Sequence, residues 1–231
     1  GVAITYRDKK KCFGPVEVFT HIEELRTIKD KVLSLSNSFL NTIVFAPESY
    51  RFSSLLHIDY PNLKYIDENH GILSKGHDYD LTTNIFDKLS GIVFFEKKPD
   101  DRLKYVKILG RENTTRKIMY IREEYIEDHG NLKKWKVILP KSNGSGALGE
   151  VLSTPLIGEP LIGHTQSFIS IGAFDSEYGA NALMKYIKTK FARTLLGILK
   201  ITQHNPGRTW KFVPLQDFTD QSDINWNVSV D

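Results

Sequence analysis

Residues 176–201 carry the clearest helical pattern in the chain, and this pattern constrains the fold more than any other sequence feature. Asp175 stands directly before the run and is the expected N-cap, with Ser176 and Glu177 in the first turn. The apolar positions, three or four residues apart, are Ala180, Leu183, Met184, Ile187, Phe191, Leu195 and Ile198. One side of this predicted helix is therefore apolar and must pack against other elements.

All other apolar runs are short. The spacing at 22–35 predicts a second amphipathic helix, and 48–57 and 81–89 are compatible with short helices. The two runs that flank GRENTTR predict a hairpin with a long, polar and basic tip. Strands are expected at 1–6, 16–19, 42–45, 91–95, 104–109, 117–121, 134–139, 166–172 and 210–213. Together these elements predict an α+β fold, with mixed short-stranded sheets and one long amphipathic helix.

The chain has 231 residues, a formal net charge of +3 and a single cysteine, Cys12. One cysteine excludes an intramolecular disulfide framework and fits a reducing compartment. No apolar run approaches the roughly 18–20 residues of a membrane span, and no leader pattern precedes the first strand. We therefore expect a cytoplasmic protein without a membrane partner.

Basic and acidic residues are segregated along the sequence. Residues 178–216 contain no Asp or Glu, 131–149 contain four lysines and no acid, and 102–122 contain seven bases against Glu112. Three such windows are typical of a polyanion-binding face. Solvated faces of a mildly basic protein would produce the same pattern.

Residues 200–218 combine amide, imidazole, guanidinium and indole groups around a Pro-Gly turn. The amides and the guanidinium carry donors and acceptors that suit base edges, whereas the lysines are point charges that suit phosphates. A helix end followed by a turn would explain Lys200 and the turn, but not the amides. The loop 142–149, SNGSGALG, can present backbone N–H groups to a phosphate. Its glycine spacing matches the dinucleotide fingerprint, but the prolines after it exclude the helix that such a site needs.

An alternative reading is a metal-dependent nuclease. An acid upstream of Glu96 and Lys98, either Asp80 or Asp87, could hold Mg²⁺ with Glu96 while the lysine lies near the scissile phosphate. A charged strand end produces the same letters. The histidines at 57, 70 and 77 lie among several aspartates, but their spacing matches no compact set of metal ligands. A third reading is a module that docks a catalytic subunit.

Three blocks of the chain resemble one protein family: YVKILGREN, KWKVILPKSNGSGALGEVLSTPLIGEPLIGHTQSFISIGAFDS, and ALMKYIKTKFARTLLGILKITQHNPGRTWKFVPLQDFT. From about 107 to 226 the sequence resembles the C-terminal part of bacterial adenine-specific DNA methyltransferases of restriction–modification systems, especially the large fused type II (type IIG-like) restriction enzymes. In that family this part is a target recognition domain, similar in style to type I specificity subunits. Residues 21–100 resemble the family far less.

The resemblance implies that 1–20 are exit strands of a methyltransferase catalytic domain, 21–216 the DNA target recognition domain, and 217–231 a truncated tail. The family's Asn/Asp-Pro-Pro-Tyr/Phe tetrapeptide and its glycine-rich S-adenosylmethionine loop do not occur here. The tetrapeptide would hold the flipped adenine. We therefore expect an excised recognition domain that is inactive alone and holds no cofactor. S-adenosylmethionine would belong to the catalytic domain of the same polypeptide, and Mg²⁺ to a fused nuclease.

The expected partner is double-stranded DNA, with no catalytic or metal-binding residue in this chain. The expected phosphate contacts are Lys107, Lys141, the loop Ser142, Asn143, Gly144, Ser145 and Gly146, and Lys200 and Lys211. The expected base contacts are Arg111, Asn113, Arg116, Gln203, Asn205 and Arg208, and Lys117 and His204 complete the predicted DNA-binding set.

Overall fold

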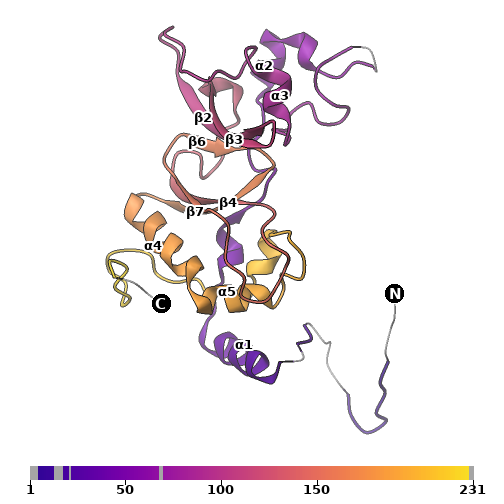
Figure 1. Cartoon of the computed structure of the whole chain (residues 1–231), viewed down its shortest axis with the longest axis vertical. Helices are drawn as coiled ribbons and strands as arrows, with labels where there is room; N and C mark the ends of the chain where they lie inside the picture. The colour runs from indigo at the N-terminus through magenta and orange to yellow at the C-terminus, as the bar shows by residue number, and fades with distance from the viewer. Residues whose placement is uncertain (1–4, 13–17, 21, 68–69, 229–231) are drawn as a thin grey trace.

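The computed structural model describes residues 5–12, 18–20, 22–67 and 70–228, and it arranges their strands in two small sheets (Figure 1). The predicted α+β class, with mixed short-stranded sheets, is confirmed. The strands predicted at 1–6 and 16–19 lie largely outside the described residues. The α-helices are α1 Glu23–Leu35, α2 Ser54–Asp59, α3 Ile85–Leu89, α4 Glu177–Lys188 and α5 Lys190–Gly197. The strands are β1 Val44–Phe45, β2 Tyr105–Glu112, β3 Thr115–Arg122, β4 Trp135–Pro140, β5 Leu156–Gly158, β6 Ile162–His164 and β7 Phe168–Phe174. Short 3-10 helices are η1 Leu40–Ile43, η2 Pro61–Leu63, η3 Glu123–Tyr125 and η4 Gly207–Trp210.

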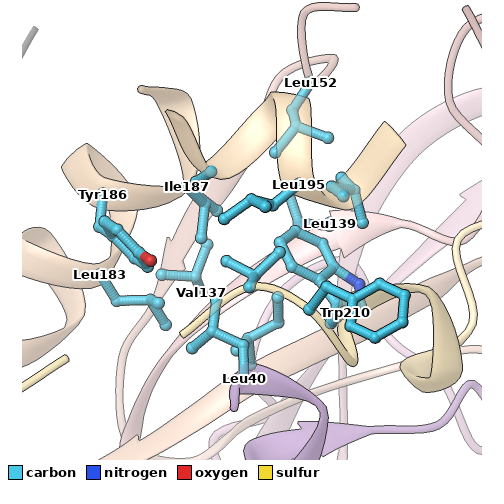
Figure 2. Close-up of a cluster of buried hydrophobic side chains, with 14 of the residues drawn as sticks. Leu40, Val137, Leu139, Leu152, Leu183, Tyr186, Ile187, Leu195 and Trp210 are labelled. Atoms are coloured by element: carbon cyan, nitrogen blue, oxygen red, sulfur yellow. The ribbon is translucent and has the colours of Figure 1, made fainter. Parts of the chain in front are cut away.

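The larger sheet has the order β1-β7-β4-β5, and its neighbouring strands are antiparallel. The helix α4 packs against β4, β5 and β7 because its apolar face meets the buried side of these strands. Trp210 from η4 and Leu40 from η1 fill the opposite end of the same core (Figure 2). We call this cluster the first core. Of the side chains that the 176–201 pattern predicts to be buried, it contains Leu183, Ile187, Leu195 and Ile198, with Met184 packed against it. Ala180 is buried outside this cluster, and Phe191 is exposed.

The single long helix predicted over 176–201 is wrong, because the chain breaks at Thr189 into α4 and α5. Thr189 has an extended backbone (φ −61°, ψ 152°), and its hydroxyl accepts from the Ala192 N–H at 3.1 Å. The same hydroxyl donates to the Tyr186 carbonyl at 2.8 Å, so one side chain ends α4 and begins α5. At the start of α4 the N-cap is Ser176, not Asp175.

The smaller sheet has the order β3-β2-β6, with β2 antiparallel to β3 and parallel to β6. The predicted hairpin is present, but its long tip is not, because β2 and β3 pair as far as Glu112 and Thr115. Only Asn113 and Thr114 form the turn, and both have positive φ, 47° and 70°. Two positive φ values are typical of the tight type I′ hairpin turn. This hairpin, α2, α3 and the segment 90–95 enclose the second core.

The two cores meet where β6 approaches β4 and β7. A small apolar cluster of Leu109, Ile138, Ile162 and Phe168 lies at this junction. Beside it, the Asn131 side chain accepts from the Tyr50 hydroxyl at 2.5 Å and donates to the Ser170 hydroxyl at 2.9 Å. The Ser170 hydroxyl also lies 3.2 Å from Nε2 of His164, which is fully buried. We call Tyr50, Asn131, His164 and Ser170 the buried polar network.

Several predicted boundaries also need correction. Residues 91–95 form a turn with isolated bridges instead of a strand, and 210–213 continue the 3-10 helix η4 as a turn. The short strands β5 and β6 were not predicted at all. The helix predicted at 48–57 begins only at Ser54, and α3 covers only the end of 81–89. The segment predicted to be a separate tail packs Phe218 and Trp226 into the first core, so no break in the core separates it from the rest.

Candidate nucleic-acid interface

Three of the seven bases in the first window, 102–122, pair with acids: Lys107, Lys117 and Arg122. The Lys107 ammonium contacts Glu159 at 2.5 Å, and this hydrogen bond raises the pKa of the lysine. The Lys117 ammonium contacts Glu112 at 2.5 Å and Glu96 at 2.6 Å, and these bonds raise its pKa. Lys107 and Lys117 are therefore engaged within the fold and are poor candidates for DNA contacts.

The window 131–149 is also not a free basic face. Lys133 pairs with Asp128 at 2.8 Å, and Lys134 pairs with Asp175. Lys136 is fully buried in β4, where its ammonium donates to the Ile162 carbonyl at 2.8 Å. Burial lowers the pKa of Lys136 to about 7. Only Lys141 remains from this window.

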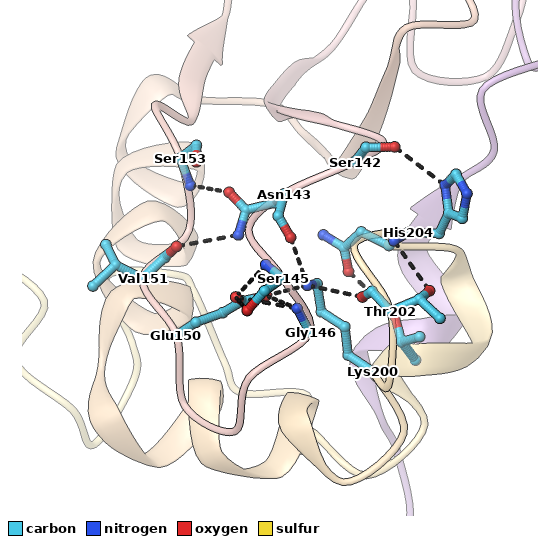
Figure 3. A network of polar contacts seen from close by, with 12 residues as sticks. Ser142, Asn143, Ser145, Gly146, Glu150, Val151, Ser153, Lys200, Thr202 and His204 are labelled. Atoms are coloured by element: carbon cyan, nitrogen blue, oxygen red, sulfur yellow. Dashed lines mark hydrogen bonds and ion pairs between the residues drawn. The ribbon is translucent and has the colours of Figure 1, made fainter.

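The glycine loop folds around its own carboxylate instead of leaving its amides open. The Glu150 carboxylate accepts from the Ser145 N–H at 2.9 Å and from the Gly146 N–H at 3.1 Å (Figure 3). Gly144 has φ +60°, and a Cβ there would collide with the same carboxylate. Burial alone would raise the pKa of Glu150, but its bonds to Lys200 and to these two amides lower it. The loop is therefore occupied by Glu150 where we predicted a phosphate.

The position of Lys200 also differs from the predicted phosphate contact. Its side chain is only 2% exposed, and the ammonium pairs with Glu150. The same ammonium donates to the Asn143 carbonyl at 2.7 Å and to the Thr202 carbonyl at 3.2 Å (Figure 3). All three hydrogens of the ammonium have acceptors inside the protein. Lys200 therefore ties the glycine loop to the end of α5 and does not face a phosphate.

Two of the predicted amide contacts are buried as well. The Asn143 side chain donates to the Val151 carbonyl at 3.1 Å and accepts from the Ser153 N–H. Asn205 is 1% exposed, and its Oδ1 accepts from the Thr209 hydroxyl at 3.2 Å. Its Nδ2 is buried and has no hydrogen-bond partner in the described part of the chain. These amides hold loops together and do not present donors to a base edge.

Residues 141–143 and 203–205 pair as two short extended segments. The Asn143 N–H donates to the Gln203 carbonyl and the Asn205 N–H donates to the Lys141 carbonyl, both at 2.7 Å. Between them, the Ser142 hydroxyl lies 3.1 Å from Nδ1 of His204 (Figure 3). This pairing joins the end of β4 to the segment before η4. It fixes the backbone of Lys141 close to the segment that leads to Arg208.

Four cations from three separate segments remain available on one side of the molecule: Arg111 and Arg116 on the hairpin, Lys141 after β4, and Arg208 in η4. We call these four residues the basic surface. Within the described part of the chain, none of them forms an ion pair. The hairpin register places Arg111 directly opposite Arg116. Like charges directly opposite each other destabilise a hairpin, so an anion that bridges them would relieve a cost already present in the fold.

Arg116 is held in place by an aromatic ring and a carbonyl. Its guanidinium carbon lies 5.5 Å from the centre of the Phe168 ring, and Nη1 donates to the Thr154 carbonyl at 3.0 Å. Burial lowers the pKa of Arg116, and the nearby charge of Arg111 lowers it further. An arginine remains charged at neutral pH after such a shift, so both guanidinium groups stay positive.

Two neighbouring pockets open beside the basic surface, and Lys141 lines both. The first, of about 170 Å³, is lined by Thr83, Arg111, Pro140, Lys141, Ser142 and Ser167, and we call it the Arg111 pocket. The second, of about 410 Å³, is the Arg208 pocket; its polar and charged lining includes Lys141, Glu48, His204, Asn205 and Arg208. Glu48 is the one acid among the residues that line the two pockets.

The other predicted contacts lie in mixed positions. Asn113 is exposed at the hairpin turn, where its N–H donates to Asp87 at 3.2 Å, and Gln203 is exposed beside His204. Lys211 is exposed, with its ammonium 5.8 Å from the centre of the Phe212 ring. The basic surface and the exposed side chains around it therefore retain part of the predicted set, without Lys107, Lys117, Asn143, Lys200 and Asn205.

The residues of the nuclease alternative do not form a metal site. Glu96 is paired with Lys117, and Asp80 lies 2.7 Å from Nδ1 of His77. Asp87 accepts from the hairpin turn instead. Among the described residues, no group of three or more His, Cys, Asp or Glu side chains could hold a metal ion. The geometry therefore gives no support to the nuclease reading.

No protein-family model, curated protein or solved structure matches the chain. In the described residues, no helix combines the length and the apolar character needed to cross a bilayer. The functional reading consequently rests on the geometry of the basic surface and on the resemblance of its sequence blocks.

Sequence reasoning missed Phe168, Thr83 and Ser167 as neighbours of the basic surface. The alternating pattern at 166–172 indicated a strand and gave no sign that its first residues would meet the hairpin. The lysines of 131–149 suggested a basic face that the structure does not have. The density of charge along a sequence does not show which acids pair with these lysines in the fold. The free cations could be identified only after the acid partners of the others were known.

Proposed function

We propose that this chain binds double-stranded DNA through the basic surface. The observation that carries the proposal is that four cations from three separate segments converge beside two pockets and form no ion pair with any described residue. Elsewhere in the same windows, basic residues such as Lys107, Lys117 and Lys134 have acid partners. Arginine and lysine side chains left uncompensated on one surface attract phosphates and make binding sensitive to salt.

More specifically, we propose that the chain is the target recognition domain of a restriction–modification adenine-N6 DNA methyltransferase, acting on cytoplasmic DNA. The support is the resemblance of the blocks around β2, β4, β7 and α4 to that family. The methyltransferase catalytic domain, with its S-adenosylmethionine, would be the partner within one polypeptide. In this reading the tight turn at Asn113 or the exposed Gln203 reads base edges, while Lys141 and Arg208 follow the backbone.

A selection from a pool of randomised duplexes tests both levels of the proposal. Several rounds of capture on the purified chain at low salt, followed by sequencing, should enrich one short motif if the domain recognises a target. Asn113→Ala or Gln203→Ala should relax the motif at one position, while Arg26→Gln, on the remote helix α1, should leave it intact. Capture without an enriched motif would limit the function to non-specific DNA binding. No capture would refute the proposal.

The proposal also expects no catalysis from this chain. Titration with S-adenosylmethionine should release no heat, and plasmid incubated with Mg²⁺ should remain uncut. Nicking that depends on Mg²⁺ and disappears in Glu96→Ala would replace the recognition reading with the nuclease reading.

A further inference from the structure

Two residues that line the Arg111 pocket each have one buried polar atom without a hydrogen-bond partner among the described residues. Nε of Arg111 and the hydroxyl oxygen of Ser167 are both buried, and neither has a hydrogen-bond partner. A buried polar group without a partner destabilises the folded protein. Both atoms are closed off from solvent, so the charges in the lining, and not these two atoms, indicate a ligand.

The lining of this pocket selects an anion. It presents the Arg111 guanidinium, the Lys141 ammonium and the hydroxyls of Thr83, Ser142 and Ser167, and it includes no Asp or Glu. Within the described part of the chain, neither Arg111 nor Lys141 forms an ion pair. A guanidinium offers two parallel N–H groups to an oxyanion, and an ammonium adds a second charge. The pocket is therefore matched to a group with several acceptor oxygens and a negative charge.

The size of the pocket restricts that anion further. A volume of about 170 Å³ is well below the roughly 300–1,000 Å³ of sites that enclose whole small molecules. A nucleotide would not fit inside, but a single tetrahedral oxyanion would. Since Arg116 lies opposite Arg111 in the hairpin, the bound charge would also offset the repulsion between the two guanidinium groups.

We propose that the Arg111 pocket binds a single phosphoryl group, supplied by one phosphodiester of the DNA backbone. This inference rests on the proposed DNA binding and adds a fixed contact to it. Lys141 also lines the Arg208 pocket, so a phosphate held by Arg111 and Lys141 would set the register of the strand that continues past Arg208. The same phosphoryl chemistry could come from free phosphate, and the experiment separates the two sources.

The first measurement is an amide NMR titration of the whole chain with inorganic phosphate, against sodium chloride at equal ionic strength. The amide signals of Thr83, Ser142 and Ser167 should shift with phosphate and not with chloride. The shifts should disappear in Arg111→Gln and in Lys141→Gln, and they should persist in Lys31→Gln on α1. Two separate variants keep the test valid if one of them fails to fold, which circular dichroism would show.

The second measurement follows the anisotropy of a labelled random duplex over a range of salt concentrations. Arg111→Gln should lower the slope of log K against log salt by about one unit, and the control Arg26→Gln should leave the slope unchanged. Phosphate shifts combined with an unchanged slope would overturn the backbone source in favour of free phosphate. DNA binding without phosphate shifts and with an unchanged slope would overturn the pocket proposal and leave the proposed function standing. No duplex binding by the wild type would overturn the proposed function as well.

Discussion

The charge state of the His164 side chain is strongly affected by the fold. It is fully buried in the buried polar network, where its Nδ1 lies 3.1 Å from the Thr165 carbonyl. Burial lowers its pKa from 6.5 to about 3, and the nearby Lys136 acts in the same direction. Burial disfavours the protonated forms of His164 and Lys136. Acidification should therefore destabilise the junction of the two cores before the rest of the protein.

The stability of the wild type should therefore fall as the pH drops below about 6.5. Between that value and about pH 3, the unfolded chain binds a proton at His164 that the folded protein does not bind. This difference gives a slope of about 1.4 kcal/mol per pH unit. Urea titrations between pH 6.5 and 5, above the range in which most carboxylates titrate, should show this slope in the wild type and its loss in His164→Gln. Equal slopes would mean that His164 is protonated in the folded protein.

We expect Lys200 to stabilise the fold and not to contact DNA. In Lys200→Met the Glu150 carboxylate stays partly buried without its cation, and removal of one member of a buried pair costs about 3–5 kcal/mol. Lys188→Met, which removes an exposed lysine from the end of α4, should change stability by less than about 0.5 kcal/mol. Chemical denaturation of both variants provides the comparison. A stable Lys200→Met variant with weakened DNA binding would return Lys200 to the phosphate-binding set.

At the scale of elements, the apolar pattern of 176–201 correctly predicts helical structure. It does not reveal that two helices form instead of one. Most of the apolar residues of 176–201 lie in one core, because their spacing determines which face is buried; Phe191 is the exposed exception. The spacing of apolar residues does not reveal that the chain leaves helical geometry at Thr189. A threonine hydroxyl can end one helix and begin the next. The hairpin was found in the same way, whereas its turn was placed too broadly because the polar residues Arg111, Glu112 and Arg116 belong to its strands.

Thr189→Val tests whether the capping hydrogen bond of Thr189, and not the shape of its side chain, stabilises the break between α4 and α5. Valine fills the same space but leaves the Ala192 N–H without its acceptor, so we expect a loss of about 1–2 kcal/mol. The control is Thr27→Val in α1, where the hydroxyl donates to the Glu23 carbonyl on an exposed face. Urea unfolding midpoints should fall for the first variant and barely change for the second. Similar midpoints would indicate that the hydroxyl of Thr189 does not hold the break.

The hairpin turn should accept glycine with a gain in stability. Thr114 has φ 70°, a conformation that costs a β-branched residue about 1–3 kcal/mol and costs glycine little. Thr114→Gly should therefore raise the melting temperature. Thr115→Gly, one residue later in β3, should lower it because glycine weakens a strand. A long flexible tip, as the sequence suggested, would show neither effect.

At the scale of the whole molecule, sequence reasoning reached the fold class and part of the basic surface. It could not foresee that 21–216 contains two cores, because their junction depends on long-range pairing such as β2 with β6. It also could not show which cations form ion pairs and which do not. Glu159 and Glu150 neutralise Lys107 and Lys200 across 52 and 50 positions of sequence. Which bases remain free is a property of the assembled molecule.

Arg111, Lys141 and Arg208 are the three residues of the basic surface that line the two pockets, so DNA binding should depend on them most directly. The most direct test measures the affinity for a random duplex against salt for three proteins: the wild type, a variant with these residues changed to Gln, and a control with Arg26, Lys31 and Lys188 changed to Gln. Both variants lose the same net charge. We expect wild-type dissociation constants on the order of micromolar and a steep salt dependence. The first variant should lower the slope by about three units, and the control should retain the wild-type slope. A flat wild-type response, or an equal effect of the two variants, would contradict the account.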